Sequence, residues 1–432
     1  MVGATKQSGF YGWWLLFFLW VVYSIPVGFV VYGVPVLYPF MIEDLGWSRG
    51  KVMMGYSAIS LLFGLTAPLI AWMIGRFGAR LTIFVGGIVA AAAGLLMALG
   101  GPIYAVFLLL SLMTGLGVAL ASALPVQTVI TFWFDVRRAL AMGLVLGGGA
   151  IGGFIAPQVL GAVVQRSNGN WRVGWLMIGV ACAAAAVVAM ITVRDRPADM
   201  GQYPDGLTPE DAHTDEPDST RGARTYRSPI GWQLRDAMRT RAIWLLAVGT
   251  VGTFLMWIIL TTQAPFHLRD QGFSAEQAAF FYSLAIGLSV LGRFCAAFMG
   301  DRFEPHLIFT FGSVCILTGS ILFWFASPQT MWAGYLFALL SGFGFGSAYI
   351  CMPTIIGNYY GPEAFAPING VIVPIVVVSE AGAAPLAGFI YDVQGSYFIV
   401  MLICWSAVIA AIAAMLLCTP PEVREVALSP AD

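Results

Sequence analysis

The sequence predicts an all-α membrane protein with twelve transmembrane helices arranged as two six-helix halves. Three observations lead to this fold class: the composition, a series of long apolar segments, and one polar interruption near the middle of the chain. Hydrophobic residues make up 59% of the 432 residues and charged residues 10%, with a mean hydropathy of +0.84. Soluble chains carry about 25% charged residues. A chain this apolar cannot cover a water-facing surface, so it must face lipid.

The apolar segments have the length of membrane spans, which need about 20 mostly apolar residues each. The first run is longer than the roughly 7–15 apolar residues of a signal peptide, so we expect a first span there and not a cleaved signal. The predicted spans are approximately 12–41, 49–74, 81–100, 103–133, 139–165, 172–193, 242–267, 275–299, 307–326, 331–358, 365–391 and 397–418.

The polar interruption at 194–241 is rich in Asp, Glu, Arg, Pro and Thr. Such a composition cannot bury a core, so we expect a largely flexible linker between the halves. The predicted organisation is listed in chain order: an N-terminal six-helix half at 1–194, a cytoplasmic linker at 195–241, a C-terminal six-helix half at 242–420 and a short cytoplasmic tail at 421–432.

The Lys and Arg residues of the loops predict the orientation, because they concentrate on the cytoplasmic side of a membrane. Most of them lie in the linker and in loops on the same side as the N-terminus. We therefore expect both termini in the cytoplasm, in the plasma membrane (the inner membrane of a bacterium).

A weak internal repeat relates the two halves. Residues 75–80 read GRFGAR after the second span, and residues 300–304 read GDRFE after the eighth. Paired six-span halves with a substrate site between them near the midplane are typical of carriers. The two loops would lock a cytoplasmic gate, and the candidate gate residues are Arg76, Gly78, Arg80, Asp301 and Arg302.

Arg293 is the one basic residue that falls inside a predicted span away from its ends. A cation there costs roughly 2.5–3.5 kcal/mol on insertion scales, so it usually faces a cavity or a partner. Arginine cannot lose its proton, and its fork matches a carboxylate with two parallel hydrogen bonds. Arg293 is therefore the candidate anion-binding residue; the alternative is a structural arginine that snorkels to the interface or pairs with an acid.

Glu380 is the acidic counterpart, near the middle of the eleventh predicted span. A carboxyl group in apolar surroundings favours its protonated form, so Glu380 is the proton-coupling candidate. It could instead pair with Arg293 or stay neutral and structural. Other polar side chains in the spans line a cavity or bond to one another: Tyr32, Gln127, Gln158, Gln263 and Tyr349.

Several other function classes find no support in the sequence. The six cysteines form no CxxC pair, and no cluster has the spacing of metal ligands. Neither a nucleophile–base pair nor a basic stripe with aromatics is present, so we expect no enzyme, no cofactor, no metal and no nucleic-acid partner.

Five segments resemble one family. They are 33–49 (GVPVLYPFMIEDLGWSR), 133–143 (WFDVRRALAMG), 194–206 (RDRPADMGQYPDG), 239–246 (RTRAIWLL) and 388–397 (GFIYDVQGSY). In this order they resemble the monocarboxylate-porter and oxalate/formate-antiporter relatives within the major facilitator superfamily, in their prokaryotic branch. The resemblance implies the major facilitator fold and a carrier of small organic anions that works by alternating access, often coupled to protons.

The resemblance also implies roles for particular residues. Arg293 matches the eighth-span arginine that binds substrate carboxylate in these relatives. Phe345 and Tyr349 fall where their tenth span lines the cavity with aromatics, and Tyr32 fits a first-span tyrosine. Ser289 stands where animal monocarboxylate carriers have an aspartate one turn before the arginine.

The sequence departs from the family's pattern at two further places. The stretch 373–379 lacks the second cation of the oxalate carrier, which disfavours oxalate. Gly75 replaces the usual loop aspartate, although Asp301 is present in the second half.

The leading hypothesis is a secondary active transporter of small monocarboxylates such as lactate or pyruvate, with protons as the coupling ion and the bilayer as its surroundings. Arg293 would bind the carboxylate, with Ser289, Tyr32, Gln127 and Gln263 among the other candidate substrate-binding residues. Alternatives are an exchanger or exporter of another organic anion, such as an aromatic acid or a dicarboxylate, and a non-transporting sensor with a transporter fold. We expect a monomer.

Overall fold

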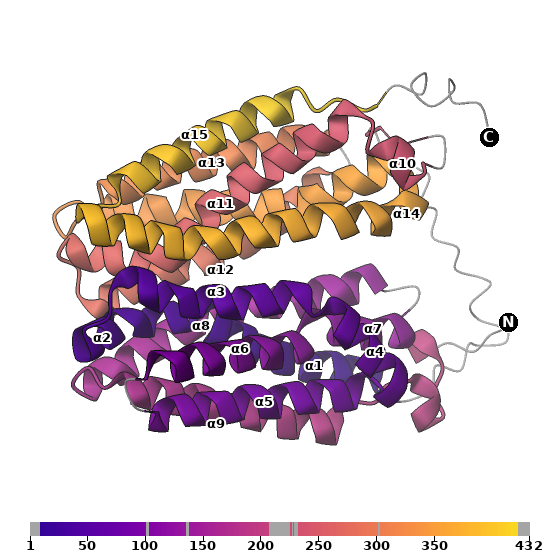
Figure 1. Ribbon diagram of the computed structural model, residues 1–432. Helices are drawn as coiled ribbons and strands as arrows, with labels where there is room; N and C mark the ends of the chain where they lie inside the picture. The colour runs from indigo at the N-terminus through magenta and orange to yellow at the C-terminus, as the bar shows by residue number, and fades with distance from the viewer. Residues whose placement is uncertain are drawn as a thin grey trace, which may run out of the picture. The chain divides into compact units, whose positions relative to one another are not determined.

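The computed structural model describes residues 9–100, 103–134, 138–206, 225–226, 228, 232–300 and 303–421, and these residues form helices and no strand (Figure 1). The helices of the first part of the chain are α1 (Gly12–Pro26) with its π-helical continuation (Val27–Tyr32), α2 (Val34–Leu45), α3 (Arg49–Leu65), α4 (Ala67–Phe77), α5 (Ala79–Leu99), α6 (Tyr104–Leu120), α7 (Ala123–Trp133), α8 (Arg138–Arg166) and α9 (Trp171–Thr192). Those of the second part are α10 (Leu234–Ala237), α11 (Arg241–Asp270), α12 (Ala275–Met299), α13 (Pro305–Trp324), α14 (Met331–Gln394) and α15 (Phe398–Leu416).

The lengths and composition of these helices confirm the predicted all-α membrane fold. Among the described residues, 11 helical segments are long and apolar enough to span a membrane, or 12 if the bent pair Arg49–Phe63 and Ala67–Phe77 forms one span. Helix α14 supplies two of them, because it is interrupted at Gly361, whose φ of +78° favours glycine. The protein is therefore an integral membrane protein.

The chain forms two compact units. Unit 1 contains Met1–Leu45 and Ala58–Arg221, and unit 2 contains Gly46–Ser57 and Gly222–Asp432. Helix α3 is thus divided: its first two turns pack into unit 2, while its remainder belongs to unit 1. This division is not visible in the hydropathy pattern, which shows one continuous apolar segment.

Unit 1 packs α5 against α6 and α9, and α1 against α8. Small residues let the backbones approach each other at these crossings. Gly28 lies against Gly152, and Gly117 against Ala90. A buried cluster around Trp133 joins α1, α7 and α8 and closes one end of the unit.

Unit 2 is built around α14, which packs along α12, α13 and α11, while α15 packs on α11. The α12–α14 crossing is close enough to exclude side chains at three glycines. A Cβ atom at each would overlap a backbone carbonyl oxygen of the opposite helix: Gly292 with Phe343, Gly342 with Ala285, and Gly346 with Ser289. These two helices therefore lie backbone to backbone.

Within the predicted linker, the described residues near unit 2 are anchored. The amide of Tyr226 donates to Glu304 Oε1 at 2.8 Å, and that of Ser228 donates to the Asn358 carbonyl at 2.8 Å. The Trp232 indole donates to Ser228 Oγ at 2.9 Å and packs edge-on against Tyr360. These residues of the predicted linker thus form hydrogen bonds and a ring contact within unit 2, while the flexibility of the linker stays a prediction.

Candidate substrate site

Arg293 lies on α12 about two turns before the helix ends, with its guanidinium over an aromatic ring. The Cζ atom is 4.9 Å from the centroid of Tyr349, a cation–π distance. Its Nε atom is buried and has no hydrogen-bond partner. Among the described residues, Arg293 forms no ion pair. The guanidinium thus lies over a ring, and its buried Nε–H has no acceptor.

Tyr349 is the exposed member of an aromatic platform that joins α11 and α14. Its side chain is 44% exposed, whereas Phe254, Trp257 and Phe345 are buried. Trp257 stacks on Phe345 with centroids 4.2 Å apart and planes at 2°. Phe345 lies 5.6 Å from Tyr349, and Phe254 stacks on Tyr349 at 6.2 Å. The platform fixes the ring that faces Arg293, and neither Phe254 nor Trp257 was identified from the sequence.

The backbone beneath Arg293 is fixed by the glycine contact of α14. A Cβ atom at Gly346 would overlap the carbonyl oxygen of Ser289 and would lie 3.0 Å from the Arg293 amide nitrogen. The Ser289 hydroxyl is buried and donates to the Ile286 carbonyl at 2.6 Å. Ser289, Arg293, Phe345 and Tyr349 are therefore brought together in unit 2.

Gln263 lies elsewhere in unit 2, in a buried network whose polar groups are satisfied. Its Nε2 donates to the Ala384 carbonyl and to Thr262 Oγ1, each at 3.2 Å. Its Oε1 accepts from the Tyr397 hydroxyl at 2.9 Å. The Tyr397 hydroxyl is the donor in this bond.

Glu380 lies on α14 and is half-buried. The described residues include no hydrogen-bond or ion-pair partner for its carboxyl group, Arg293 included. Of the alternatives that the sequence left open, a pair between Glu380 and Arg293 is thus not formed.

The remaining candidates fall in unit 1 or outside the described residues. Tyr32 ends the π-helical segment and Gln127 lies on α7; both side chains are half-buried. Arg76 is exposed at the end of α4, with its Cζ 5.8 Å from the Phe77 ring. Asp301 and Arg302 lie outside the described residues.

Gly78 and Arg80 form a turn that is bound to Asp195 at the start of the predicted linker. Asp195 Oδ1 accepts from the Arg80 amide at 2.8 Å, and Arg80 Nε donates to the Met190 carbonyl at 2.8 Å. Gly78 has a φ of +85°, and a Cβ atom there would overlap Asp195 Oδ2. Glycine is required at this position for both reasons. The role of Asp195 was missed from the sequence, which lacks a local signal for the pairing.

A second arginine site, which the sequence analysis did not identify, lies at the start of α3. Arg49 binds Asp270 through two parallel hydrogen bonds, Nη1 to Oδ2 and Nη2 to Oδ1, each 2.8 Å long. Its Cζ lies 3.7 Å from the Tyr391 ring centroid, and Nη1 also donates to the Tyr397 hydroxyl at 3.1 Å. We call Arg49, Asp270, Tyr391 and Tyr397 the Arg49 cluster.

Asp392 completes the attachment of α3 beside this cluster. Its two carboxylate oxygens accept from the backbone amides of Arg49 and Gly50, each at 2.9 Å. A carboxylate at a helix N-terminus satisfies otherwise unpaired amides and the helix dipole. The start of α3 is therefore held in unit 2 by two carboxylates.

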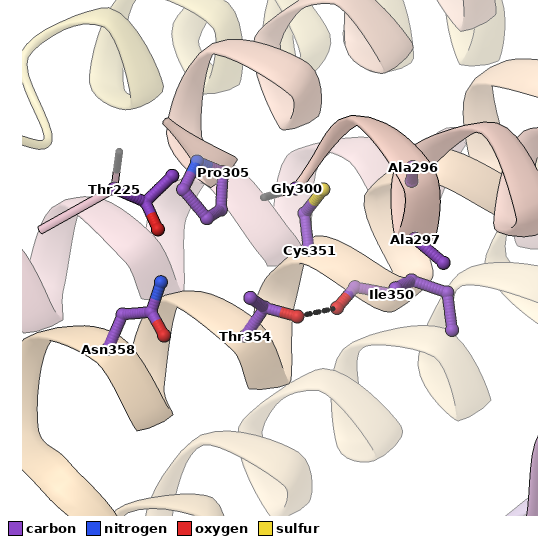
Figure 2. A pocket seen from close by; sticks show the side chains of 9 residues that line it. All are labelled: Thr225, Ala296, Ala297, Gly300, Pro305, Ile350, Cys351, Thr354 and Asn358. Atoms are coloured by element: carbon purple, nitrogen blue, oxygen red, sulfur yellow. Dashed lines mark hydrogen bonds between the residues drawn. The ribbon is translucent and has the colours of Figure 1, made fainter. Parts of the chain in front are cut away.

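A small cavity of about 130 Å³ lies at the end of α12 (Figure 2). Its described lining carries no charged residue: Thr225, Ala296, Ala297, Gly300, Pro305, Ile350, Cys351, Thr354 and Asn358. The Thr354 hydroxyl donates to the Ile350 carbonyl at 2.8 Å. Because none of these side chains is a cation, this cavity is poorly suited to an anion, in contrast to the surroundings of Arg293.

The comparison with known families agrees with this architecture. The family model of the Major Facilitator Superfamily matches residues 16–379. The chain belongs to the major facilitator superfamily. As a member of this superfamily it is a transporter and not an enzyme, which confirms the corresponding predictions.

Curated relatives of this superfamily member include monocarboxylate transporters. Monocarboxylate transporter 3 of Rattus norvegicus is 25% identical over 419 residues, covering 95% of this chain and 80% of the relative. Monocarboxylate transporter 12 of Rattus norvegicus is 24% identical over 379 residues, covering 82% of this chain and 74% of the relative. The predicted monocarboxylate-transporter-like branch is confirmed, while its prokaryotic side stays a prediction.

Solved structures of the superfamily show the same fold. A point mutant of the nucleoside transporter NupG aligns with a TM-score of 0.71 at 13% identity, covering 94% of this chain and 99% of that one. An inward-facing bacterial homolog of the human lysosomal transporter Spinster aligns with a TM-score of 0.66 at 17% identity, covering 95% of each chain. At these identities the likeness concerns the fold alone.

Proposed function

We propose that the protein carries small monocarboxylates of the lactate and pyruvate kind across the plasma membrane by alternating access, with both termini and the linker in the cytoplasm. In this proposal Arg293 binds the carboxylate, and Tyr349 and Phe345 form the wall beside it. The predicted division into six-helix halves at 1–194 and 242–420 belongs to the same proposal, as does a monomeric carrier.

The observation that carries the proposal is the state of the Arg293 guanidinium. Its Nε is buried without a hydrogen bond, and its Cζ lies 4.9 Å from the exposed Tyr349 ring. A buried donor that lacks an acceptor costs roughly 1–3 kcal/mol. A substrate carboxylate would supply the acceptor through two parallel hydrogen bonds and would neutralise the charge.

The number of cations favours a single carboxylate. Arg293 is the one basic residue in the sequence that lies within a span away from its ends, and the stretch 373–379 has no Lys or Arg. A second carboxylate of a dicarboxylate substrate would lose its hydration without gaining a matching charge. We therefore expect monocarboxylates to be carried in preference to oxalate.

Proton coupling is assigned to Glu380. Its carboxyl group has no ion-pair partner among the described residues, so neither protonation state is fixed by a neighbouring charge. If Glu380 must bind a proton before the loaded carrier reorients, uptake rises as the outside becomes more acidic. Glu380→Gln should then transport at a rate independent of the proton gradient.

The test is uptake of labelled lactate into proteoliposomes with an inside pH of about 7.5 and an outside pH of about 6, a gradient that drives proton-coupled carriers. We compare the wild type with Arg293→Gln and with Arg172→Gln, a matched loss of an arginine in unit 1. The proposal requires uptake by the wild type and by Arg172→Gln, and none by Arg293→Gln at equal reconstitution. Equal uptake by all three would make Arg293 structural.

One observation favours a second candidate, an aromatic monocarboxylate. The exposed Tyr349 ring rests on a platform of three further aromatic residues, and a substrate ring could stack on this surface. Competition with unlabelled pyruvate, benzoate and oxalate separates the candidates. Stronger inhibition by benzoate than by pyruvate would identify the aromatic acid as the better substrate.

A further inference from the structure

His267 is a buried titratable residue that lies beside the Arg49 cluster. Its side chain is 3% exposed. The imidazole stacks on Trp324 with centroids 5.0 Å apart, lies 4.7 Å from the Phe323 ring and 6.3 Å from that of Tyr397. Its Nε2 atom is buried and has no hydrogen-bond partner. A polar atom enclosed in this way is costly to keep and calls for an explanation.

The charged groups near His267 are Arg49 and Asp270 of the Arg49 cluster, together with Asp392 and Arg269. Asp270 follows it by one turn on α11 and is bound by both terminal nitrogens of Arg49. Tyr397 lies edge-on to the imidazole and hydrogen-bonds to both Arg49 and Gln263. Tyr391 lies beneath Arg49, and Asp392 caps the start of α3. With Arg269 in the last turn of α11, two arginines and two carboxylates thus lie at this end of the helix.

A proton on Nε2 does not fit this arrangement. The imidazolium would have an enclosed N–H without an acceptor, and its charge would add to that of Arg49. Asp270 is the nearest carboxylate along α11, but its two oxygens are already bound by Arg49. The packed cluster therefore accommodates the neutral ring. A charged ring needs a hydrogen-bond acceptor, either a water molecule or a carboxylate oxygen of Asp270 that is released from Arg49.

We infer that His267 is a proton-binding site that couples acid pH to the release of Gly46–Ser57 from unit 2. The neutral ring is enclosed when the Arg49 cluster is closed, and the proton binds when the cluster opens. A proton that binds one of two conformations shifts the population toward that conformation, so lower pH favours the open cluster.

The part of the chain that would be released is defined by its contacts. The amides of Arg49 and Gly50 are bound by Asp392, and the Ser57 hydroxyl donates to the Ala381 carbonyl. Gly388 lies against Gly50, with a Cβ at Gly388 only 2.8 Å from the Gly50 Cα. These two turns belong to unit 2, whereas the rest of α3 belongs to unit 1. Opening the cluster would therefore release these two turns from the rest of unit 2. This proton site is distinct from Glu380.

The first test observes the proton directly and needs no substrate. The chain has 3 histidines, so ¹³C-labelled histidine gives few signals, and the double variant His213→Gln/His306→Gln leaves His267 alone. Its Cε1 resonance should move to the position of imidazolium between about pH 8 and about pH 5, the range in which histidine titrates. A resonance that stays at the neutral position throughout this range would overturn the inference.

The second test measures release of α3. Cys295, the exposed one of the free cysteines, is first replaced by Ser. A cysteine introduced by Ser57→Cys then reports, through its labelling rate, how tightly α3 packs against Ala381. Labelling rates are compared between backgrounds with His267 and with His267→Gln at the same pH, which cancels the thiol's own pH dependence. Arg49→Gln serves as the open control.

The ratio of the two rates should be about 1 at pH 8 and about fivefold or more at pH 5.5, because linkage to one proton changes a population by up to tenfold per pH unit. A ratio near 1 at both pH values would refute the coupling, even if His267 titrates. Since neither test uses lactate, their failure would leave the monocarboxylate proposal untouched.

Discussion

Unit 2 holds two arginines over tyrosine rings, and they differ in what faces the guanidinium. Arg49 lies 3.7 Å from the Tyr391 centroid and binds the carboxylate of Asp270 with two hydrogen bonds of 2.8 Å. Arg293 lies 4.9 Å from the Tyr349 centroid and has a buried Nε without a partner. Both are cations that lie over a ring, but among the described residues only the first is bound by a carboxylate of the protein.

The Arg49 cluster thus shows which geometry a carboxylate adopts on a ring-supported arginine in this unit. If a substrate carboxylate binds Arg293 in the same way, Arg293 should matter for transport and little for stability, and Arg49 should show the reverse. The predictions below use this difference.

The largest effect is expected for Arg293→Lys. The variant keeps the positive charge but loses the planar fork, so kcat/KM for lactate uptake should fall about 100-fold, since arginine and lysine are not interchangeable at two-point carboxylate sites. The thermal midpoint of the purified protein should stay unchanged. Transport at the wild-type rate would show that charge alone is sufficient and would end the analogy with Arg49.

Arg49→Gln should act on stability. Its side chain is 16% exposed and that of Asp270 35%, so the ion pair is partly screened, and we expect a loss of roughly 1–3 kcal/mol in the free energy of unfolding. The double variant Arg49→Gln/Asp270→Asn should recover part of this loss, because it leaves no unpaired charge. Denaturant melts in detergent measure both variants. A double variant that is no more stable than Arg49→Gln would contradict the coupling of the pair.

Gly346→Ala tests whether Arg293 depends on the contact between α12 and α14. The new methyl group would overlap the Ser289 carbonyl and force the helices apart, at a cost of about 1–3 kcal/mol. Lactate KM should rise as well, because the Arg293 backbone moves. Gly370→Ala is the matched control, since nothing lies within 4 Å of a Cβ atom there. An equal response of both variants would contradict the prediction.

Tyr349→Leu should have a smaller effect, limited to the cation–π contact. Such contacts contribute about 0.5–1 kcal/mol where exposed, which corresponds to a rise in KM of about two- to fivefold. Tyr349→Phe keeps the ring and should transport like the wild type. If Tyr349→Phe raises KM as much as Tyr349→Leu does, the hydroxyl group of Tyr349, and not its ring, contributes to substrate binding.

Asp44→Asn should have the smallest effect. Asp44 Oδ2 accepts from Arg172 and Trp171 in unit 1, but the two charged side chains are 38% and 49% exposed. Exposed pairs contribute about 0–1 kcal/mol. A loss as large as that of Arg49→Gln, measured in the same denaturant melts, would show that exposure does not explain the difference between the two pairs.

The fold could be predicted from the sequence because membrane spans are defined by local composition. About twenty apolar residues in a row are sufficient evidence for a span, and the polar linker marks the middle of the chain. The division of α3 between the units could not be predicted in this way, since it depends on contacts between residues 49 and 270, which are 221 positions apart.

Arg293 of the candidate site could be predicted from the sequence for a different reason. Arg293 stands out because a cation inside a span costs free energy and therefore usually faces a cavity or a charged partner. Arg49 and Asp270 lie at the ends of spans, where charged residues are ordinary, so no local signal distinguishes them from loop residues. His267 was placed at a span end for the same reason, and its enclosure by Phe323 and Trp324 appears only in the structure.

The contact of α12 with α14 at Gly292, Gly342 and Gly346 has a thermodynamic consequence. Because the backbones touch, we expect the two helices to move together and Arg293 to keep its place over Tyr349 if the protein works by alternating access as proposed. A ligand that binds two states with equal affinity cannot change their ratio. If Arg293 and Tyr349 bind the substrate as proposed, they would contribute to substrate selection, and the free energy that couples substrate binding to the change of access would come from groups outside this pair of helices.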